Sequence, residues 1–414
     1  MTDIQQWLNK HLVRLNLVDE MDYENGFSRP SFSSEEKQAH EVYTEIAKEL
    51  GLHIYTDEAG NRWATWHVDF YTPTIALGSH LDTVYGGGGY DGVAGVLTAL
   101  GAIKLLQEHR LEPRKNIAII CFASEESARF GVSTIGSKAI SGLLPKEELE
   151  SVVDSEGITL KEAIETFGLD WNTIDKAEKP QSALESFVEL HIEQGTQIED
   201  QQADVGIVRG VACPIRLQIT CRGMANHTGT TPMNKRADAF TAIAPLITYV
   251  EEQALQMNEQ LESPLVATVS TAAIKPNAMN VIPGEVQLGI DIRSVNDEAK
   301  HELAERITHY CKTIEQKRAV AIDVHTLVHN DSVFLDNRIQ QKLQKASDKL
   351  QMKWVAMDSG AGHDVMNMAN KWPSGLLFIP CTDGISHHPK EHTSLSDLEK
   401  GTRVIAEFLQ EEVR

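Results

Sequence analysis

The sequence predicts an α/β fold in which a mixed, largely parallel sheet carries helices on both faces, with a smaller two-layer domain inserted into it. Residues 74–79 and 116–123 are continuous apolar stretches of strand length, and a helix is expected between them from about residue 92 to 109. This pattern is typical of parallel strands buried on both faces. Residues 214–327 instead follow the order β-α-β-β-α-β, which is typical of a split βαβ unit.

The first third of the chain alternates helices and strands. Ser33 and Ser34 precede a stretch with apolar residues at helical spacing, which Gly51 ends. Short strands are expected at residues 53–56 and 62–67, joined by the turn residues DEAGN.

The middle of the chain carries its own set of elements. Its expected strands are residues 214–221, 265–272, 285–292 and 320–327, and its helices run from about 234 to 257 and from 297 to 314. The α/β pattern then returns, with strands at 354–357 and 376–380 and a final helix. We therefore predict a catalytic domain made of residues 1–211 and 329–414, and an inserted domain made of residues 212–328.

Composition excludes several classes of protein. A formal net charge of −22 over 414 residues disfavours binding to nucleic acids and to anionic membranes. The first residues, MTDIQQWLNK, lack the apolar run of a signal peptide, and the apolar stretch 117–123 is far shorter than the roughly 20 residues of a membrane span. Five scattered cysteines without a CxxC pair indicate neither a disulfide framework nor a thiolate zinc site. We expect a cytoplasmic location.

Four of the expected strands end in side chains that bind metals. These side chains are His80 and Asp82 with Asp91 after four glycines, Glu125 with Glu126, His191 with Glu193, and His387. The carboxyl ends of parallel strands meet at one edge of a sheet, so these residues are expected to converge there. Histidines combined with carboxylates favour zinc over calcium or magnesium, which prefer oxygen ligands. Taken singly, each histidine could equally be a loop residue, and the Glu pair could be an exposed helix start.

A nucleotide site is a weaker interpretation of the same region. Gly87, Gly89 and Gly92 match the spacing GxGxxG between a strand and a helix. However, Asp82 and Asp91 would place negative charge where a pyrophosphate would bind. The sequence also has no GK[ST] loop and no G-x-S-x-G elbow at the strand ends, which disfavours P-loop and serine-hydrolase chemistry.

Seven segments together resemble the M20-type zinc amidohydrolases. They are GSHLDTVYGGGGYDGVAGV, EESARFG, VELHIEQG, ANHTGTTPMNKRAD, NVIPG followed by DIR, SGAGHD and GISHHPKE. They occur in family order from about residue 30 to 400 and are most similar to the hydantoinase/carbamoylase branch. This branch includes N-carbamoyl-L-amino-acid hydrolases, allantoate amidohydrolases and β-alanine synthases. The resemblance implies a zinc-exopeptidase-like fold.

The resemblance also implies two zinc ions per chain, for which Mn²⁺, Co²⁺ or Ni²⁺ could substitute. The first ion would be held by His80, Asp91 and His191, and the second by Asp91, Glu126 and His387. Asp82 would support His80, and Glu125 would be the general base. The turn YGGGGYDG has more glycine than is usual in the family, and the extra glycine is expected to loosen the loop of the bridging Asp91.

The resemblance assigns substrate binding mainly to the inserted domain. Arg293 would bind a carboxylate, and Asn280 and His227 would bind the polar end, with Gln194 and residues 360–364 contributing from the large domain. His227 would also take part in catalysis, in its own chain or across a dimer. The inserted domain would act as a lid and would pair two chains as a homodimer. Without the resemblance, Arg293 fits a surface ion pair and His227 a loop histidine equally well.

The function implied is hydrolysis of the ureido C–N bond of a small anionic substrate, an N-carbamoyl-L-amino acid, with release of ammonia and CO2. Allantoate is the alternative ureido substrate. A peptidase or an N-acyl-amino-acid deacylase on the same scaffold is a second enzymatic alternative. A catalytically inactive binding protein is the alternative from another class, but the complete set of ligands together with Glu125 argues against it.

Overall fold

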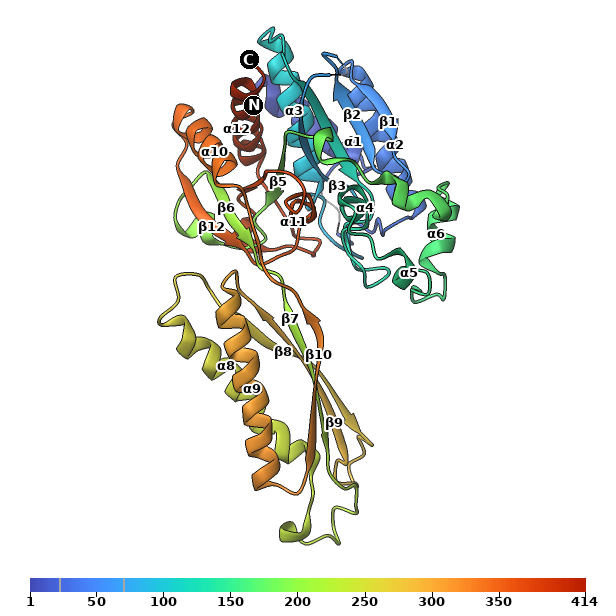
Figure 1. Cartoon of the computed structure of the whole chain (residues 1–414), viewed down its shortest axis with the longest axis vertical. Coiled ribbons are helices and arrows are strands. Elements are labelled where there is room, and N and C mark those ends of the chain that lie inside the picture. Colours follow the sequence, from blue (N-terminus) through green and yellow to red (C-terminus); the bar gives the residue numbers. More distant parts are fainter. Residues whose placement is uncertain (22–23, 70) are drawn as a thin grey trace. The chain divides into compact units, whose positions relative to one another are not determined.

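A computed structural model describes residues 1–21, 24–69 and 71–414 (Figure 1). The chain divides into two compact units. Unit 1 consists of Met1–Arg209, Leu335–Ser359 and His363–Arg414, and unit 2 consists of Gly210–Phe334 with Gly360–Gly362. Unit 2 is thus formed by the middle of the sequence. The roles of the two units as a catalytic domain and a lid or dimerisation domain stay predictions.

Unit 2 has the β-α-β-β-α-β order that the sequence predicts. Its elements are β7 (Ile215–Arg222), α8 (Ala239–Asn258), β8 (Val266–Lys275), β9 (Glu285–Arg293), α9 (Asp297–Lys317) and β10 (Ala321–His329). The strands form an antiparallel sheet in the order β10-β7-β9-β8. Helix α8 begins later than the expected residue 234. The Asp238 side chain accepts hydrogen bonds from the amides of Phe240 and Thr241, which fixes the first turn there.

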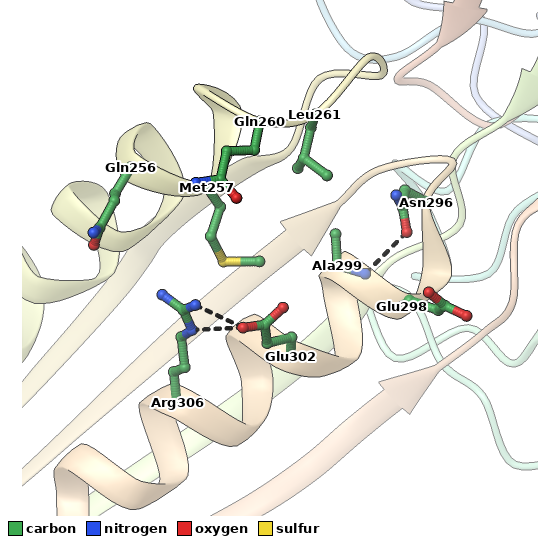
Figure 2. A pocket seen from close by; sticks show the side chains of 9 residues that line it. All are labelled: Gln256, Met257, Gln260, Leu261, Asn296, Glu298, Ala299, Glu302 and Arg306. Carbon is green, nitrogen blue, oxygen red and sulfur yellow. Dashed lines mark hydrogen bonds and ion pairs between the residues drawn. The ribbon is translucent and has the colours of Figure 1, made fainter.

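Both helices of unit 2 cover the same face of its sheet (Figure 1). Strand β7 buries Ile215, Leu217 and Ile219 against them, whereas Arg216 is exposed and Gln218 is half-buried, as period-2 alternation requires. The end of α8 and the start of α9 border a pocket with a largely polar lining (Figure 2). It is lined by Gln256, Met257, Gln260, Leu261, Asn296, Glu298, Ala299, Glu302 and Arg306. None of the predicted site residues lines this pocket.

Unit 1 is built on a mixed sheet with a parallel centre, which confirms the predicted fold class. The strand order is β1-β2-β4-β3-β5-β13-β6, and β12 also pairs with β6. Strands β4, β3, β5 and β13 are parallel, whereas β1, β2 and β6 run antiparallel to their neighbours. The strands are β1 (His53–Thr56), β2 (Arg62–Trp66), β3 (Thr74–His80), β4 (Asn116–Phe122), β5 (Ser186–Ile192), β6 (Val205–Val211), β12 (Trp354–Ser359) and β13 (Ser374–Ile379). A short strand, β11 (Val333–Phe334), pairs with the last residues of β6.

Helices pack around this sheet, and loops connect them to its strands. The α-helices are α1 (Asp3–Leu15), α2 (Ser34–Glu49), α3 (Val93–Glu108), α4 (Ile135–Ser141), α5 (Lys146–Leu149), α6 (Leu160–Phe167), α7 (Gln197–Asp200), α10 (Asn337–Lys349), α11 (Asp364–Met368) and α12 (Leu395–Glu412). Short 3-10 turns lie at Trp171–Ala177, Gln181–Ala183 and Thr382–Gly384, and a further one lies in unit 2 at Met233–Lys235. Among the described residues, no helix combines the length and apolar character needed to cross a membrane.

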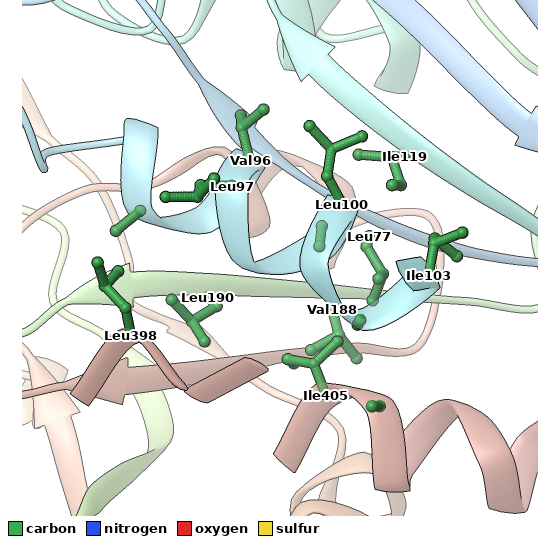
Figure 3. Close-up of a cluster of buried hydrophobic side chains, with 14 of the residues drawn as sticks. Leu77, Val96, Leu97, Leu100, Ile103, Ile119, Val188, Leu190, Leu398 and Ile405 are labelled. Carbon is green, nitrogen blue, oxygen red and sulfur yellow. The ribbon is translucent and has the colours of Figure 1, made fainter. Parts of the chain in front are cut away.

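Helix α3 lies at the centre of the core of unit 1 (Figure 3). It is buried on nearly all sides, because it packs on β3 and β5 and also against α12. The approach to the sheet is close: a Cβ atom added at Gly95 would lie 2.2 Å from the carbonyl oxygen of Leu190. This packing fixes the start of α3, and therefore the position of Asp91 just before it.

The five cysteines are all buried and none forms a disulfide. This agrees with the prediction that the fold depends on no disulfide framework.

Candidate metal centre

The predicted metal ligands of unit 1 converge at the carboxyl ends of β3, β4, β5 and β13. Two groups of three ligand atoms form there, each with all members within 4.8 Å of one another. The first group is His80, Asp91 and His191, and the second is Asp91, Glu126 and His387. The structure therefore brings together all five residues that the sequence analysis expects to bind metal.

Asp91 is shared by both groups through different oxygens. Its Oδ1 lies 3.3 Å from His80 Nε2 and 3.2 Å from His191 Nε2. Its Oδ2 lies 3.4 Å from His387 Nε2, and that same nitrogen is 3.4 Å from Glu126 Oε1. A carboxylate placed in this way has the geometry of a bridge between two cations.

These separations fit divalent metals. Ligands held at about 2.0–2.1 Å from a tetrahedral zinc ion lie roughly 3.4 Å apart. Two imidazoles with one carboxylate, and one imidazole with two carboxylates, are donor sets that suit zinc and similar transition metals better than calcium. Asp91, Glu126 and Glu125 are all buried, and such carboxylates are costly without a compensating cation. The residues present therefore fit the metals that the resemblance implies.

The histidines of the first group are oriented by acceptors on their other ring nitrogen. Nδ1 of His80 is 3.0 Å from the carbonyl oxygen of Asp82 and 3.3 Å from its Oδ1. Nδ1 of His191 is 3.0 Å from the carbonyl oxygen of Ile192. A proton on Nδ1 leaves the lone pair of Nε2 facing Asp91, which is the tautomer that ligates a metal.

Asp82 also fixes the segment that carries the two glutamates. Its carboxylate accepts hydrogen bonds from the amides of Glu125, at 3.0 Å, and Glu126, at 2.9 Å. Ser31 donates a third hydrogen bond to it, at 3.0 Å. Ser124, just before the pair, has a φ of 55° in the left-handed region, an uncommon conformation for a residue other than glycine.

The adjacent glutamates have different surroundings. Glu126 faces His387 and belongs to the second ligand group, whereas Glu125 belongs to neither group among the described residues. Oε2 of Glu125 lies 3.9 Å from His80 Nε2, so this carboxylate is next to the first group without being part of it. Burial raises the pKa of Glu125 well above its ordinary value, with a smaller opposing effect from His80.

Gln194 and His387 also have left-handed backbone conformations, as Ser124 does, with φ values of 59° and 55°. Three such residues around one site are a sign of backbone strain at a functional centre. Gln194 donates from Nε2 to Asp91 Oδ2 at 2.6 Å, which fixes the orientation of its amide. Its Oε1 is buried and has no hydrogen-bond partner among the residues described. Glu193, by contrast, turns away and accepts the amides of Gln197 and Ile198 at the start of α7.

The glycine-rich turn is tightly packed, and the expectation that its extra glycine loosens it is wrong. A Cβ atom added at Gly88 would lie 2.3 Å from both Cβ and Oε1 of Glu391. One added at Gly89 would lie 2.7 Å from the ring of Phe27. The glycines are therefore required by close neighbours, and they let those neighbours reach the loop of Asp91.

Buried polar residues from the segment 359–364 also reach the site. The ring of His363 lies 4.5 Å, centroid to centroid, from that of His191, and burial lowers the pKa of His363 well below its ordinary value. Asp364 is fully buried. Its burial is the main cause that raises its pKa well above the ordinary value, and the negative charge of the neighbouring Glu189 is the second cause. Glu189, which the sequence analysis missed, accepts hydrogen bonds from Ser79 and from the amide of Val365.

The predicted substrate-binding residues His227, Asn280 and Arg293 lie in unit 2. His227 is exposed and accepts a hydrogen bond from the amide of Gly229, and Asn280 is exposed. Arg293 donates from Nε to Asp291 at 2.7 Å and from a terminal nitrogen to the carbonyl of Gly360 at 2.9 Å. These contacts hold its guanidinium in place. Its role as a carboxylate ligand, and the roles of His227 and Asn280, stay predictions.

A model of the peptidase family M20/M25/M40 matches residues 56–411 of this chain. The chain is 35% identical over 381 residues to an N-carbamoyl-L-amino acid amidohydrolase of Geobacillus stearothermophilus, with 92% of each chain covered. It is 32% identical to a ureidoglycolate hydrolase of Arabidopsis thaliana (94% of this chain and 84% of that protein covered). It is 30% identical to an allantoate amidohydrolase of Escherichia coli (94% and 93% covered).

A solved structure of a hydantoinase/carbamoylase family amidase from Burkholderia ambifaria has a similar fold. The two superpose with a TM-score of 0.87 at 26% identity, covering 99% of this chain and 98% of that one. The resemblance on which the sequence analysis relied is thereby confirmed. The chain belongs to the peptidase family M20/M25/M40, and it is a hydrolase that acts on C–N bonds.

Proposed function

We propose that this chain is a two-metal hydrolase that cleaves the carbamoyl C–N bond of N-carbamoyl-L-amino acids. The products are the free amino acid, ammonia and CO2, which together account for the substrate and one water molecule. The observation that carries the proposal is the division of the glutamate pair: Glu126 belongs to the second ligand group, whereas Glu125 belongs to neither group among the described residues and lies next to the first. The relatives named above support the ureido group as the reacting group, because allantoate and ureidoglycolate carry it as well.

The two ligand groups would hold two divalent metals, for which we propose zinc, with Mn²⁺, Co²⁺ or Ni²⁺ as substitutes. Bound there, such metals would lower the pKa of a water molecule and polarise the scissile carbonyl. Glu125 would accept the proton of the attacking water and deliver it to the departing nitrogen.

Other residues of unit 1 would orient the reacting groups. Asp82 would hold Glu125 through the main-chain amide, and it would keep His80 in its ligating tautomer. The unpartnered Oε1 of Gln194 is a buried acceptor beside Asp91, and it suits the N–H donors of a ureido group. We propose that Gln194 recognises this end of the substrate.

A panel of substrates tests the proposed function. The protein would be incubated with Zn²⁺ or Mn²⁺ and with N-carbamoyl-L-amino acids, allantoate or ureidoglycolate, and ammonia release would be measured. N-acetyl-L-amino acids with the same side chains and dipeptides are the matched controls, and their cleavage would be measured as release of free amino acid, because it liberates no ammonia. We expect ammonia from the N-carbamoyl compounds and little turnover of the controls. Preferred turnover of allantoate would correct the substrate, cleavage of the controls would indicate a deacylase or peptidase, and no turnover by metal-loaded protein would indicate a binding protein.

Arg293 gives a second test, directed at the substrate carboxylate. Arg293→Ala should reduce kcat/KM for an N-carbamoyl amino acid far more than for the matching N-carbamoyl amino amide. Loss of one partner of a desolvated ion pair costs about 2–5 kcal/mol, or roughly 30- to several-thousand-fold. Arg216→Ala is the matched control, because Arg216 also binds Asp291, at 2.8 Å, but is more exposed. Equal losses on the acid and the amide would show that Arg293 has only a structural role.

A further inference from the structure

The side chain of Glu391 connects two loops that carry metal ligands. Its Oε1 accepts hydrogen bonds from the amides of Tyr90 and Asp91, both at 2.9 Å. Its Oε2 accepts a hydrogen bond from the hydroxyl of Ser386 at 2.9 Å and one from the amide of His387 at 3.3 Å. Glu391 is only 4% exposed, and it lies 300 residues from Asp91 in the sequence.

All four of these partners are hydrogen donors, so a carboxylate is the group that satisfies them together. One oxygen faces the loop after β3, which carries Asp91, and the other faces the loop after β13, which carries His387. In the second ligand group these two residues lie 3.4 Å apart. Glu391 therefore fixes the backbone of both residues relative to each other.

The glycine-rich turn is shaped around this carboxylate. Gly88 has no room for a Cβ atom, because Cβ, the carboxyl carbon and Oε1 of Glu391 would all lie within 2.4 Å of it. Gly88 does not have the positive φ that glycine alone favours, so the contact with Glu391 explains the need for glycine here.

The first ligand group has separate supports. His80 and His191 lie at the ends of β3 and β5, and each has an acceptor of its own on Nδ1. Of that group, only Asp91 is held by Glu391. In the second group, Glu391 holds Asp91 and His387, two of the three ligands.

Ser386 adds a constraint of the same kind. Its hydroxyl lies 3.0 Å from Asp91 Oδ2 and 2.9 Å from Glu391 Oε2, but it has one hydrogen and can donate to only one of them. When Asp91 Oδ2 serves as a metal ligand, the hydroxyl is free to donate to Glu391.

From these contacts we infer that Glu391 is a positioning residue that sets Asp91 against His387, so that the second metal site depends on it more than the first. This inference rests on the proposed two-metal function. Glu391 touches neither substrate nor reacting atoms in this account, and it acts through the two ligands that it holds.

Metal binding to Glu391→Gln tests the inference. The glutamine side chain has the same size, but an NH2 group replaces one carboxylate oxygen. This group faces hydrogen-bond donors and cannot accept hydrogen bonds from them. Equilibrium dialysis with Zn²⁺ and with Mn²⁺ would give the number of ions per chain and their Kd values. We expect the first ion to bind nearly as in the wild type, and the second to bind about 10–100-fold more weakly, as is usual when a group that orients a ligand is changed.

Asp57→Asn is the matched control. Asp57 is a buried carboxylate of the same unit that accepts the amides of Ala59 and Asn61 and the indole N–H of Trp63, and it touches no metal ligand. The control should lower Tm while keeping two ions at wild-type Kd values. If Glu391→Gln and Asp57→Asn weakened the binding of the second ion equally, the effect would come from general destabilisation, and the inference would be overturned.

Gly88→Ala provides an independent route, because it displaces the Glu391 side chain without changing its charge. It should weaken the second site in the same way as Glu391→Gln. If the wild type binds fewer than two ions, the two-metal proposal fails. If the wild type binds two ions and both variants bind two with unchanged Kd values, only the role of Glu391 is refuted.

Discussion

Glu125→Gln should lower kcat by about 10²–10⁴-fold while the protein still binds two metal ions per chain. The expected factor is the usual contribution of a general acid–base group, and an amide can neither take up nor release the proton. Metal binding should persist because Glu125 lies next to the first ligand group and, among the described residues, belongs to neither group. Steady-state ammonia release and elemental analysis on the same preparation would measure both effects.

Glu126→Gln is the matched control for this experiment, since it makes the same chemical change at the adjacent residue. Because Glu126 Oε1 faces His387 Nε2 in the second ligand group, this variant should lose affinity for one ion, and excess metal should restore part of its activity. Near-normal turnover by Glu125→Gln would refute its assignment as the base. So would a loss of metal equal to that in Glu126→Gln.

Asp91→Ala should abolish detectable activity and remove both metal sites. Each oxygen of Asp91 faces a different ligand group, so truncation takes one ligand from each of two sites that have only three protein ligands. Dialysis against Zn²⁺ followed by elemental analysis would count the remaining ions.

Asp82→Asn gives a graded comparison for Asp91→Ala. Asp82 orients His80 and the amides of the glutamate pair but belongs to neither ligand group among the described residues. Its replacement should weaken metal binding or activity about 10–100-fold without removing a site. One ion retained at wild-type affinity in Asp91→Ala would show that Asp91 does not bridge.

The sequence predicted the centre of the fold and the convergence of the five candidate metal ligands, because both follow from local patterns. Strands β3, β4 and β13 are apolar runs, each followed by or ending in a candidate metal ligand, and a parallel sheet brings their carboxyl ends to one edge. Strand β6 was missed, because Gly206, Arg209 and Gly210 interrupt both the apolar run and the alternation that indicate a strand.

The residues that support the site were missed for a different reason. Glu391 holds main-chain amides 300 residues away, and the buried Glu36 accepts the amide of Ser124, 88 residues away, at 2.8 Å. A carboxylate that binds distant amides leaves no periodic signal near itself in the sequence. The only local trace was the glycine at position 88, which the sequence alone suggested was a source of looseness rather than of close packing.

We propose that two metals held by His80, Asp91, Glu126, His191 and His387 enable Glu125 to hydrolyse a ureido group. To test this mechanism, metal would be removed with a chelator, and the metal-free protein would be titrated with Zn²⁺ while ammonia release from an N-carbamoyl-L-amino acid is followed. We expect no activity without metal, and recovery of activity that levels off at two equivalents of Zn²⁺ per chain. Full activity of the chelated, metal-free protein would refute the two-metal mechanism.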